Sequence, residues 1–477
     1  MAGICMGFEV HQPFRLNPVF SPEEAKGRRD LKSFYFDRRN RDILRKVARN
    51  CYIPAAEIVL DALDGGMRYA FSFSGTLIEQ MEEWCPEALS LFTDIAVHPN
   101  TELLAQTYYH SLAGFFADRD EFVEEVRMHT DLMHDLFGVR PRVAENTEFS
   151  LDDGIAADLR DLGFQAVYTE GADRIVPVNA LNETCTCCGI PLLLRNCPLS
   201  DDIAFRFSWP GWDKRPLMAD TYASWIAMSP GRCAHVFIDF ETFGEHQPRE
   251  SGIFEFLAYL PAALADEGVA LFTPSEAAAL PPAAEITLRR PVSWADLEKD
   301  ESAWLGNRLQ RYAFSALEHS PARQMRPELW RYLGTSDHFY YLAQKGGSCG
   351  DVHRYFCPAG IEEAYDTFMA ILSHLERRCL GKGKRPLASV PNPEAFHFRM
   401  PDGRYAGVSA HGLREFEEAL LSVPGESVLW HLERGDYAPW IRDAIGDRKL
   451  AAEVETAASP ADLERAVHER RCSLCTL

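Results

Sequence analysis

Short apolar runs alternate with amphipathic helical patterns through roughly the first 275 residues, and no other feature constrains the fold as strongly. The strand-like runs are rich in β-branched and aromatic residues and cover 4–10, 69–73, 102–107, 143–148, 166–170, 192–196, 235–241 and 270–273. Helical patterns between them cover 55–63, 121–137, 152–162, 219–228 and 254–265. Such alternation is typical of a parallel sheet covered by helices, and the number of repeats predicts a sheet closed into a barrel.

The alternating pattern ends in a segment rich in Pro, Ala and Glu at 274–287. Helical patterns follow at 303–318, 328–341 and 360–379, and Gly, Pro and basic residues make 381–393 typical of a linker. A chain of 477 residues is also long for a single domain. We therefore predict an α/β barrel over 1–280, a helical region over 281–380 and a small, mainly helical C-terminal module over 394–477.

The net charge of the chain limits the kinds of partner that it can bind. With 49 basic and 71 acidic residues, the net charge of −22 disfavours binding to nucleic acid or to anionic membranes. No apolar run reaches the roughly 18 residues of a spanning helix, and the N-terminus lacks a secretory pattern. The 13 cysteines are odd in number and thinly spread, which fits a reducing compartment. We expect a cytoplasmic protein.

Polar side chains gather where the predicted strands end, which is where functional residues lie in parallel barrels. His11 and Gln12 follow the first strand, and Pro13 stops its hydrogen-bond ladder. Tyr108 and His110 follow the third strand and suit a polar ligand. Such residues are also common in ordinary buried polar networks, so each run is a weak signal by itself.

A third run, Glu145 to Glu148, closes the strand predicted over 143–148. Strand alternation would place Glu148 and Asn146 on one side and Glu145 and Thr147 on the other. One carboxylate is then expected to point into the barrel, while the other is solvated or structural. A carboxylate inside a barrel is costly unless it is hydrogen-bonded or used.

The fourth run is the richest in acids and begins at Asp239, at the end of the strand predicted over 235–241. Alternation would put Asp239 and Glu241 on one face, so that both reach one cavity with Glu148. Two carboxyl groups in one cavity are what glycosidic cleavage needs, because one attacks the anomeric carbon and the other protonates the departing oxygen. Nearby phenylalanine rings and acids could hold one carboxyl group neutral.

Together these runs resemble glycoside hydrolase family 57, in order and spacing, over about residues 1–379. The resemblance rests on 8–13, 102–111, 146–148, 239–246 and 335–341. It implies an incomplete (β/α)7 barrel without metal or other cofactor. It also implies that Glu148 is the nucleophile and Asp239 the general acid/base in retaining, amylase-like cleavage of α-1,4-glucan.

The resemblance further implies a set of substrate-binding residues from the strand ends and the helical region. They are His11, Gln12, Tyr108, His110, Glu241, His246, Trp304, Asp337 and His338. Many family members carry a second His where this chain has Glu9, which leaves the contacts at the first run open. Other tryptophans that could stack on sugars are Trp209, Trp212, Trp225 and Trp330.

The sequence leaves alternatives for the reaction. A 4-α-glucanotransferase or branching enzyme would use the same carboxylates and differ in how its loops exclude water. A metal-dependent polysaccharide deacetylase would need a set such as His11, His110, His246 and Asp239. A non-catalytic glucan-binding or regulatory protein is a further alternative, because the C-terminal module resembles one of unknown function attached to carbohydrate enzymes.

A cysteine cluster at 185–188, with Cys197, could bind zinc. Its spacing differs from the usual Cys-x-x-Cys pairs, and adjacent cysteines rarely bind the same tetrahedral ion. Free thiols in a loop are therefore the interpretation that the sequence favours.

Overall fold

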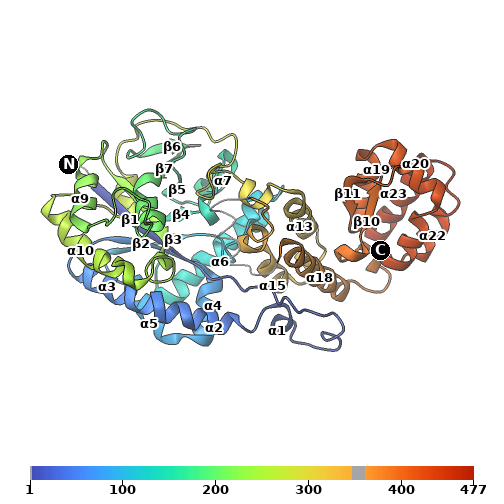
Figure 1. The fold of residues 1–477 in the computed structure, drawn as a ribbon, viewed down its shortest axis with the longest axis horizontal. Helices are drawn as coiled ribbons and strands as arrows, with labels where there is room; N and C mark the ends of the chain where they lie inside the picture. Colours follow the sequence, from blue (N-terminus) through green and yellow to red (C-terminus); the bar gives the residue numbers. More distant parts are fainter. Residues whose placement is uncertain (1–2, 346–359, 477) are drawn as a thin grey trace. The chain divides into compact units, whose positions relative to one another are not determined.

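Seven parallel strands close into a barrel in the computed structural model of the chain, which describes residues 3–345 and 360–476 (Figure 1). The strands pair in the order β2-β3-β4-β5-β7-β8-β1, and β1 also pairs with β2, so the ring is complete. They are β1 (Gly3–Val10), β2 (Tyr69–Phe73), β3 (Thr101–Ala105), β4 (Val143–Glu145), β5 (Ala166–Glu170), β7 (Ile190–Arg195) and β8 (Ala234–Asp239). The predicted seven-stranded barrel is therefore confirmed.

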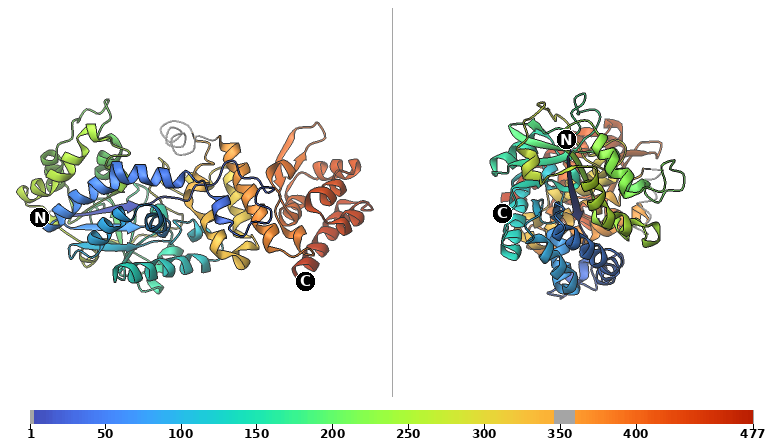
Figure 2. Two further views of the ribbon diagram at one scale, coloured as in Figure 1. Left: turned by 90° about the horizontal axis from the view of Figure 1, so that it is seen from below. Right: turned by 90° about the vertical axis from the view of Figure 1, so that its left-hand side faces the viewer.

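Helices surround this barrel, as both views in Figure 2 show. They are α2 (Asn40–Val47), α3 (Ile53–Asp64), α4 (Gly75–Trp84), α5 (Pro86–Ala96), α6 (Asp120–Phe137), α7 (Asp153–Asp161), α8 (Cys197–Asp201), α9 (Ala219–Met228), α10 (Ile253–Asp266) and α11 (Pro274–Ala278). Two short strands extend the sheet: β6 (Cys185–Cys187) forms a hairpin with β7, and β9 (Ala270–Leu271) pairs with β1. None of the helices in the described segments combines the length and apolar character required to cross a membrane.

Alternate residues of β1 face the helices and the barrel interior. Phe8 and Val10 pack in the large core beneath the helices, whereas Cys5 belongs to the smaller cluster inside the barrel. Gly7 lies against the ring of Phe237, and a Cβ atom at this position would come within 2.4 Å of that ring. Glycine is therefore required here because a bulky ring fills the barrel interior.

Two of the predicted helical patterns are interrupted in the structure. The pattern over 303–318 divides into α12 (Ser302–Leu305) and α13 (Arg308–Glu318), because Asn307 caps the second helix in a capping box with Gln310. The pattern over 328–341 divides into α15 (Pro327–Trp330), a 3₁₀ turn and α16 (Ser336–Tyr340). Helical periodicity continued across both breaks, so the sequence pattern alone did not reveal them.

The chain separates into two compact units. The first contains Met1–Phe14, Arg38–Gly306 and Gly334–Asp337, and the second contains Arg15–Asp37, Asn307–Leu333 and His338–Leu477. Elements of the second unit not yet given are α1 (Lys32–Tyr35), α14 (Ala322–Met325), α18 (Ile361–Cys379), β10 (Phe396–Arg399), β11 (Tyr405–Ala410), α19 (Leu413–Ser422), α20 (Gly425–Arg434), α21 (Tyr437–Trp440), α22 (Arg448–Val454) and α23 (Pro460–Thr476). The predicted boundaries at 280 and 394 stay predictions.

Candidate active site

The loop after β4 places Glu148 in an unusual backbone conformation. The strand ends at Glu145, three residues earlier than the 143–148 run predicted, and Thr147–Phe149 forms a 3₁₀ turn. Glu148 has φ 61° and Phe149 has φ 56°, in the left-handed region that is strained for residues other than glycine. Strain of this kind persists only where the surroundings hold the backbone, and it is common at functional sites.

The turn at Glu148 changes which way its carboxylate points. Regular alternation would have put Glu148 and Glu145 on opposite sides, and that expectation is wrong because the strand stops before Glu148. Glu145 is buried and accepts a hydrogen bond from Ser72, on the interior side of β2 (3.0 Å). Glu148 instead hydrogen-bonds to Trp294 and Ser336, two residues far away in the sequence.

Both carboxylate oxygens of Glu148 accept hydrogen bonds. Trp294 Nε1 donates to Oε2 (2.6 Å), and Ser336 Oγ donates to Oε1 (3.0 Å). The indole of Trp294 is itself fixed by stacking on Phe149, with ring centroids 4.9 Å apart and planes at 12°. The Glu148 side chain keeps 20% of its surface exposed, so it is oriented and still accessible to a ligand.

Asp239 is the last residue of β8 and is partly buried. Burial and the charge of Glu148 raise the pKa of Asp239 to about 7, against the lowering effects of Arg195 and His110. Asp239 ends β8 and Glu148 follows the end of β4, so both carboxyl groups lie at the carboxyl ends of parallel barrel strands. A carboxyl group that is partly protonated at neutral pH can act as a general acid.

Two stacked histidines lie beside Glu148, with ring centroids 4.0 Å apart. His11 Nδ1 lies 2.7 Å from Ser74 Oγ, and His11 Nε2 lies 3.0 Å from Asp337 Oδ2. Burial and the charge of His110 lower the pKa of His11 to about 4. At neutral pH His11 is therefore an uncharged ring held between two hydrogen-bonding partners.

His110 has the opposite electrostatic character. Burial alone would lower its pKa, but the nearby carboxylates of Glu148 and Glu9 raise it to about 9. His110 Nε2 lies 3.7 Å from Glu148 Oε1, and Nδ1 lies 2.8 Å from Gln106 Oε1. The site thus contains a cation next to the accessible carboxylate.

A layer of buried acids lies beneath His110. Gln106 Nε2 donates to Glu9 Oε1 (2.8 Å) and to Ser72 Oγ (2.8 Å), and Ser72 in turn donates to Glu145. Burial and the charge of Glu145 raise the pKa of Glu9 well above its ordinary value, and burial raises the pKa of Glu145 to about 7. Hydrogen bonds therefore connect the interior acids to the histidine that faces Glu148.

Glu241 lies close to Asp239, although not through strand alternation. Strand β8 ends at Asp239, and Phe240–Thr242 forms a 3₁₀ turn, so the prediction that Asp239 and Glu241 share a strand face is wrong. The hydroxyl of Tyr52 donates to Glu241 Oε1. Burial, together with the charge of Asp239, raises the pKa of Glu241 to about 8.

The remaining predicted binding residues have other surroundings. Tyr108 donates its hydroxyl to Glu79 (2.9 Å), and the buried Gln12 accepts hydrogen bonds at its carbonyl oxygen from Thr76 and Gln80. The backbone nitrogen of His246 donates to the carbonyl oxygen of Glu241 (2.9 Å), and burial lowers the pKa of the His246 ring to about 4.

Two predicted residues do not offer an open face to a sugar. Trp304 is 0% exposed, so its ring packs in the interior of the first unit. His338 belongs to the second unit, where it is buried with Nε2 3.2 Å from the carbonyl oxygen of Tyr332. Of the other tryptophans, Trp330 is also buried, whereas Trp209 is 56% exposed.

Three residues of this site were missed by sequence reasoning. No strand or helix pattern marks Trp294. Ser336 lies in the predicted helical pattern over 328–341 and in the motif at 335–341, but no role was assigned to it. Arg195 is the last residue of β7, so the tendency of functional residues to lie at strand ends could have identified it. Its guanidinium donates to Glu170 (2.8 Å) and Asp201 (2.9 Å) and lies 5.5 Å from the Trp294 ring centroid.

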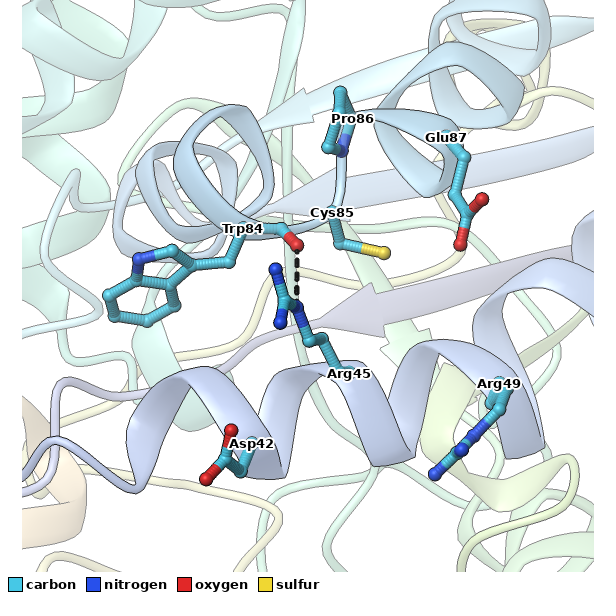
Figure 3. Close-up of a pocket in the computed structure, with 7 residues that line it drawn as sticks. All are labelled: Asp42, Arg45, Arg49, Trp84, Cys85, Pro86 and Glu87. Atoms are coloured by element: carbon cyan, nitrogen blue, oxygen red, sulfur yellow. Dashed lines mark hydrogen bonds between the residues drawn. The ribbon is translucent and has the colours of Figure 1, made fainter.

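A separate cavity of about 580 Å³ lies away from these groups, between α2 and the junction of α4 with α5 (Figure 3). Arg45 Nε donates there to the carbonyl oxygen of Trp84 (3.1 Å). None of the predicted catalytic or binding residues lines this cavity. The strand ends hold the converging carboxyl groups and histidines, so they are the stronger candidate for catalysis.

Comparison with known proteins identifies the class. The sequence profile described as "Glycosyl hydrolase family 57" matches residues 5–289. A Methanocaldococcus jannaschii protein described as "Putative alpha-amylase" is 39% identical over 396 residues, which is 78% of this chain and 84% of that protein. The protein is thus a glycoside hydrolase. It belongs to glycosyl hydrolase family 57.

Solved structures share the fold at low sequence identity. The 4-alpha-glucanotransferase from Thermococcus litoralis superposes with a TM-score of 0.58 at 15% identity, over 90% of this chain and 68% of that chain. The family 57 branching enzyme from Thermococcus kodakaraensis superposes with a TM-score of 0.55 at 11% identity, over 80% and 90%. These likenesses show the architecture alone.

Proposed function

We propose that the protein cleaves α-1,4-linked glucan with retention of configuration, with Glu148 as nucleophile and Asp239 as general acid/base. The observation that carries the proposal is the contrast between two carboxyl groups at one end of the barrel. Donors hold both oxygens of Glu148, while burial and the charge of Glu148 raise the pKa of Asp239 to about 7. Glycosidic cleavage needs one carboxylate and one carboxylic acid.

In the first step, Asp239 would give its proton to the glycosidic oxygen while a Glu148 oxygen attacks the anomeric carbon. The bond to the leaving chain breaks, and a glycosyl ester forms on Glu148. In the second step, the Asp239 carboxylate takes a proton from water, which attacks the anomeric carbon and releases Glu148. A retaining mechanism requires the two carboxyl groups to lie about 5 Å apart.

The neighbouring residues have roles that follow from their contacts. His110, cationic at neutral pH and 3.7 Å from Glu148 Oε1, would stabilise the carboxylate that leaves in the second step. Trp294 would hold the other oxygen in place during attack. Asp337 orients His11, and either residue could contact sugar hydroxyls at the open side of the site.

Chain cleavage and chain transfer would use the same carboxylates, so products must separate them. We expect incubation with a maltooligosaccharide ladder to generate new reducing ends. Redistribution of chain lengths without new reducing ends would indicate the 4-α-glucanotransferase alternative, and new α-1,6 linkages would indicate a branching enzyme. Glucan binding without any bond cleavage would support the non-catalytic alternative.

The deacetylase alternative is not supported by the arrangement of its expected ligands. Among residues 3–345 and 360–476, one group of His, Cys, Asp or Glu side chains lies close enough together to bind a metal ion. That group is Asp153, Cys187 and Cys188. His11 and His110 instead hydrogen-bond to Ser74, Asp337 and Gln106. Membership of family 57 points to glucan chemistry as well.

Two isosteric variants test the proposed roles. We expect Glu148→Gln to reduce kcat by at least about 10⁴-fold, because no ester can form. We expect Asp239→Asn to reduce cleavage of maltooligosaccharides by about 10²–10⁴-fold, but to affect an aryl α-glycoside much less, because a good leaving group needs no protonation. Thermal unfolding of both variants is the control for folding. Substantial activity in Glu148→Gln would remove that residue from the nucleophile role.

A further inference from the structure

The β6–β7 hairpin brings two adjacent cysteines next to an aspartate. Cys187 ends β6 and pairs with Ile190, which begins β7, so Cys188 and Gly189 form a two-residue loop. Both loop residues have positive φ, 50° and 82°. Asp153 begins α7, directly after its capping residue. All three polar side chains belong to the first unit.

The spacing of this group is compatible with a tetrahedral metal site. The sulfur atoms of Cys187 and Cys188 and a carboxylate oxygen of Asp153 all lie within 4.8 Å of one another. Cys187 Sγ lies 3.4 Å from Asp153 Oδ1. Zinc at about 2.3 Å from sulfur and about 2.0 Å from oxygen would separate these two ligands by about 3.5 Å in a tetrahedron.

The conformation of Cys188 removes the objection raised by its adjacency to Cys187. In a regular strand, adjacent side chains point to opposite faces and could not bind the same ion. The left-handed conformation at Cys188 interrupts this alternation and turns its thiol toward Cys187. Loops of this type favour Asn, Asp or Gly at that position, so cysteine there is a costly choice that a ligand role would explain.

We propose that Asp153, Cys187 and Cys188 bind a thiophilic divalent cation, with zinc(II) as the best match. Three protein ligands leave one position for water. Cys188 and Asp153 are partly exposed, which gives an ion access from solvent, while Cys187 is buried. The ion would be structural, because none of the three ligands is among the residues whose side chains contact Glu148.

Neighbouring groups already orient the proposed ligands. Asp153 Oδ1 accepts a hydrogen bond from the backbone nitrogen of Leu288 (2.6 Å), and Asp153 donates its own backbone nitrogen to the carbonyl oxygen of Leu288 (3.1 Å). Arg160 on α7 donates to the carbonyl oxygen of Cys188 (2.6 Å) and places positive charge near two thiolates and a carboxylate. Such supporting contacts tune metal affinity.

The ion would connect three segments behind the proposed nucleophile. Asp153 follows Glu148 closely in the chain, and Leu151 between them pairs with Val292. The hairpin pairs with the same connecting segment, through Thr186 and Glu285. Binding would therefore stabilise the loop that carries Glu148, and its effect should appear in unfolding as well as in activity.

Metal binding at this site should depend on pH. Cys187 and Cys188 are free thiols, and only the thiolate form of cysteine binds such an ion. The thiol must lose its proton to bind the ion, so affinity should rise as pH increases.

The test uses the full chain, reduced and stripped of metal, in a Cys472→Ser/Cys475→Ser background. Those two exposed cysteines could bind metal by themselves and are removed for that reason. Cobalt(II) is the probe, because thiolate ligands give it charge-transfer bands in the near ultraviolet. We expect one equivalent of cobalt to bind, zinc to displace it, and zinc to raise Tm.

Each of two substitutions removes one proposed ligand and keeps the size of the side chain, so that no cavity forms. Cys188→Ser and Asp153→Asn should each weaken binding by at least about 100-fold, and Asn can still accept the Leu288 hydrogen bond. Cys185→Ala is the matched control, because Cys185 lies in the same hairpin but outside the group, and it should bind cobalt like the parent. Absence of thiolate bands in the parent, or bands that survive in Cys188→Ser, would overturn the proposal.

Discussion

The two carboxyl groups at the barrel end experience different surroundings. Glu148 accepts hydrogen bonds from Trp294 and Ser336 and lies next to a cationic His110. Burial and the charge of Glu148 raise the pKa of Asp239 to about 7. The difference arises from neighbouring residues and not from the carboxyl groups themselves, which explains how two acids could take opposite roles.

The pKa of Asp239 leads to a prediction for the pH dependence of the enzyme. Asp239 must be protonated to act on the leaving oxygen, so kcat/KM should fall as pH rises through about 7. Above that pH the decline should approach tenfold per pH unit. A pH series of initial rates on a maltooligosaccharide checks this. A kcat/KM that stays constant from about pH 5 to pH 9 would contradict the role of Asp239.

At the scale of elements, the strand ends determine the site, and sequence patterns located them only in part. The runs at 69–73 and 166–170 coincide with β2 and β5, because continuous buried apolar residues mark a strand clearly. The runs at 143–148 and 235–241 were too long, because each includes residues of the 3₁₀ turn that follows its strand. Periodicity cannot report a left-handed residue such as Glu148.

Sequence patterns did not predict the two hydrogen bonds that the Glu148 carboxylate accepts. Trp294 is separated from Glu148 by most of the barrel, and nothing in the segment around it marks a strand or helix. Ser336 reaches Glu148 from the start of α16. The positions of Glu148 and Asp239 at predicted strand ends made them candidates, and the resemblance to a family assigned their separate roles. The fold was therefore easier to predict than the surroundings of the site.

The buried acids of β1 and β4 lead to a prediction for stability. The pKa of Glu145 is about 7 in the folded protein, above its ordinary value, so the folded state binds more protons than the unfolded state at intermediate pH. Stability from this group is present at low pH and is lost as pH rises toward and through about 7. The loss at high pH is on the order of 3 kcal/mol.

Glu145→Gln tests this linkage, because an amide resembles the protonated acid and can still accept from Ser72. We expect the free energy of unfolding of the variant to exceed that of the parent at about pH 8.5 and to match it at about pH 5. Denaturant unfolding at both pH values is the measurement, and Glu102→Gln, on an acid near the other end of the barrel, is a control. If the variant were less stable than the parent at high pH, the ionised form of Glu145 would stabilise the folded protein, and the prediction would be wrong.

At the scale of the whole molecule, every residue placed at the site belongs to the first compact unit. The C-terminal segment has a hydrophobic core of its own, in which Phe396, Phe398 and Phe416 pack with Tyr437 and Ile441. The second unit also includes Asn307–Leu333, so the module predicted over 394–477 stays a prediction.

Removal of the predicted C-terminal module tests whether it contributes to catalysis. A chain ending at residue 393 should retain kcat/KM on short maltooligosaccharides to within about threefold, because none of the proposed catalytic contacts involves the removed part. Activity on long glucans, measured in parallel, reports any role of the module in binding. Loss of cleavage on short substrates, in a chain that circular dichroism shows to be folded, would mean that the module helps form the active site.

The central claim is a covalent glycosyl ester on Glu148, and trapping that ester tests it most directly. A fluorinated α-maltosyl fluoride, whose ring fluorine slows hydrolysis of the ester, should label the protein, and peptide mass mapping should place the sugar on Glu148. Released products of an unmodified substrate should have the α configuration. A label on Asp239 or another carboxylate, or products of inverted configuration, would contradict the proposed mechanism.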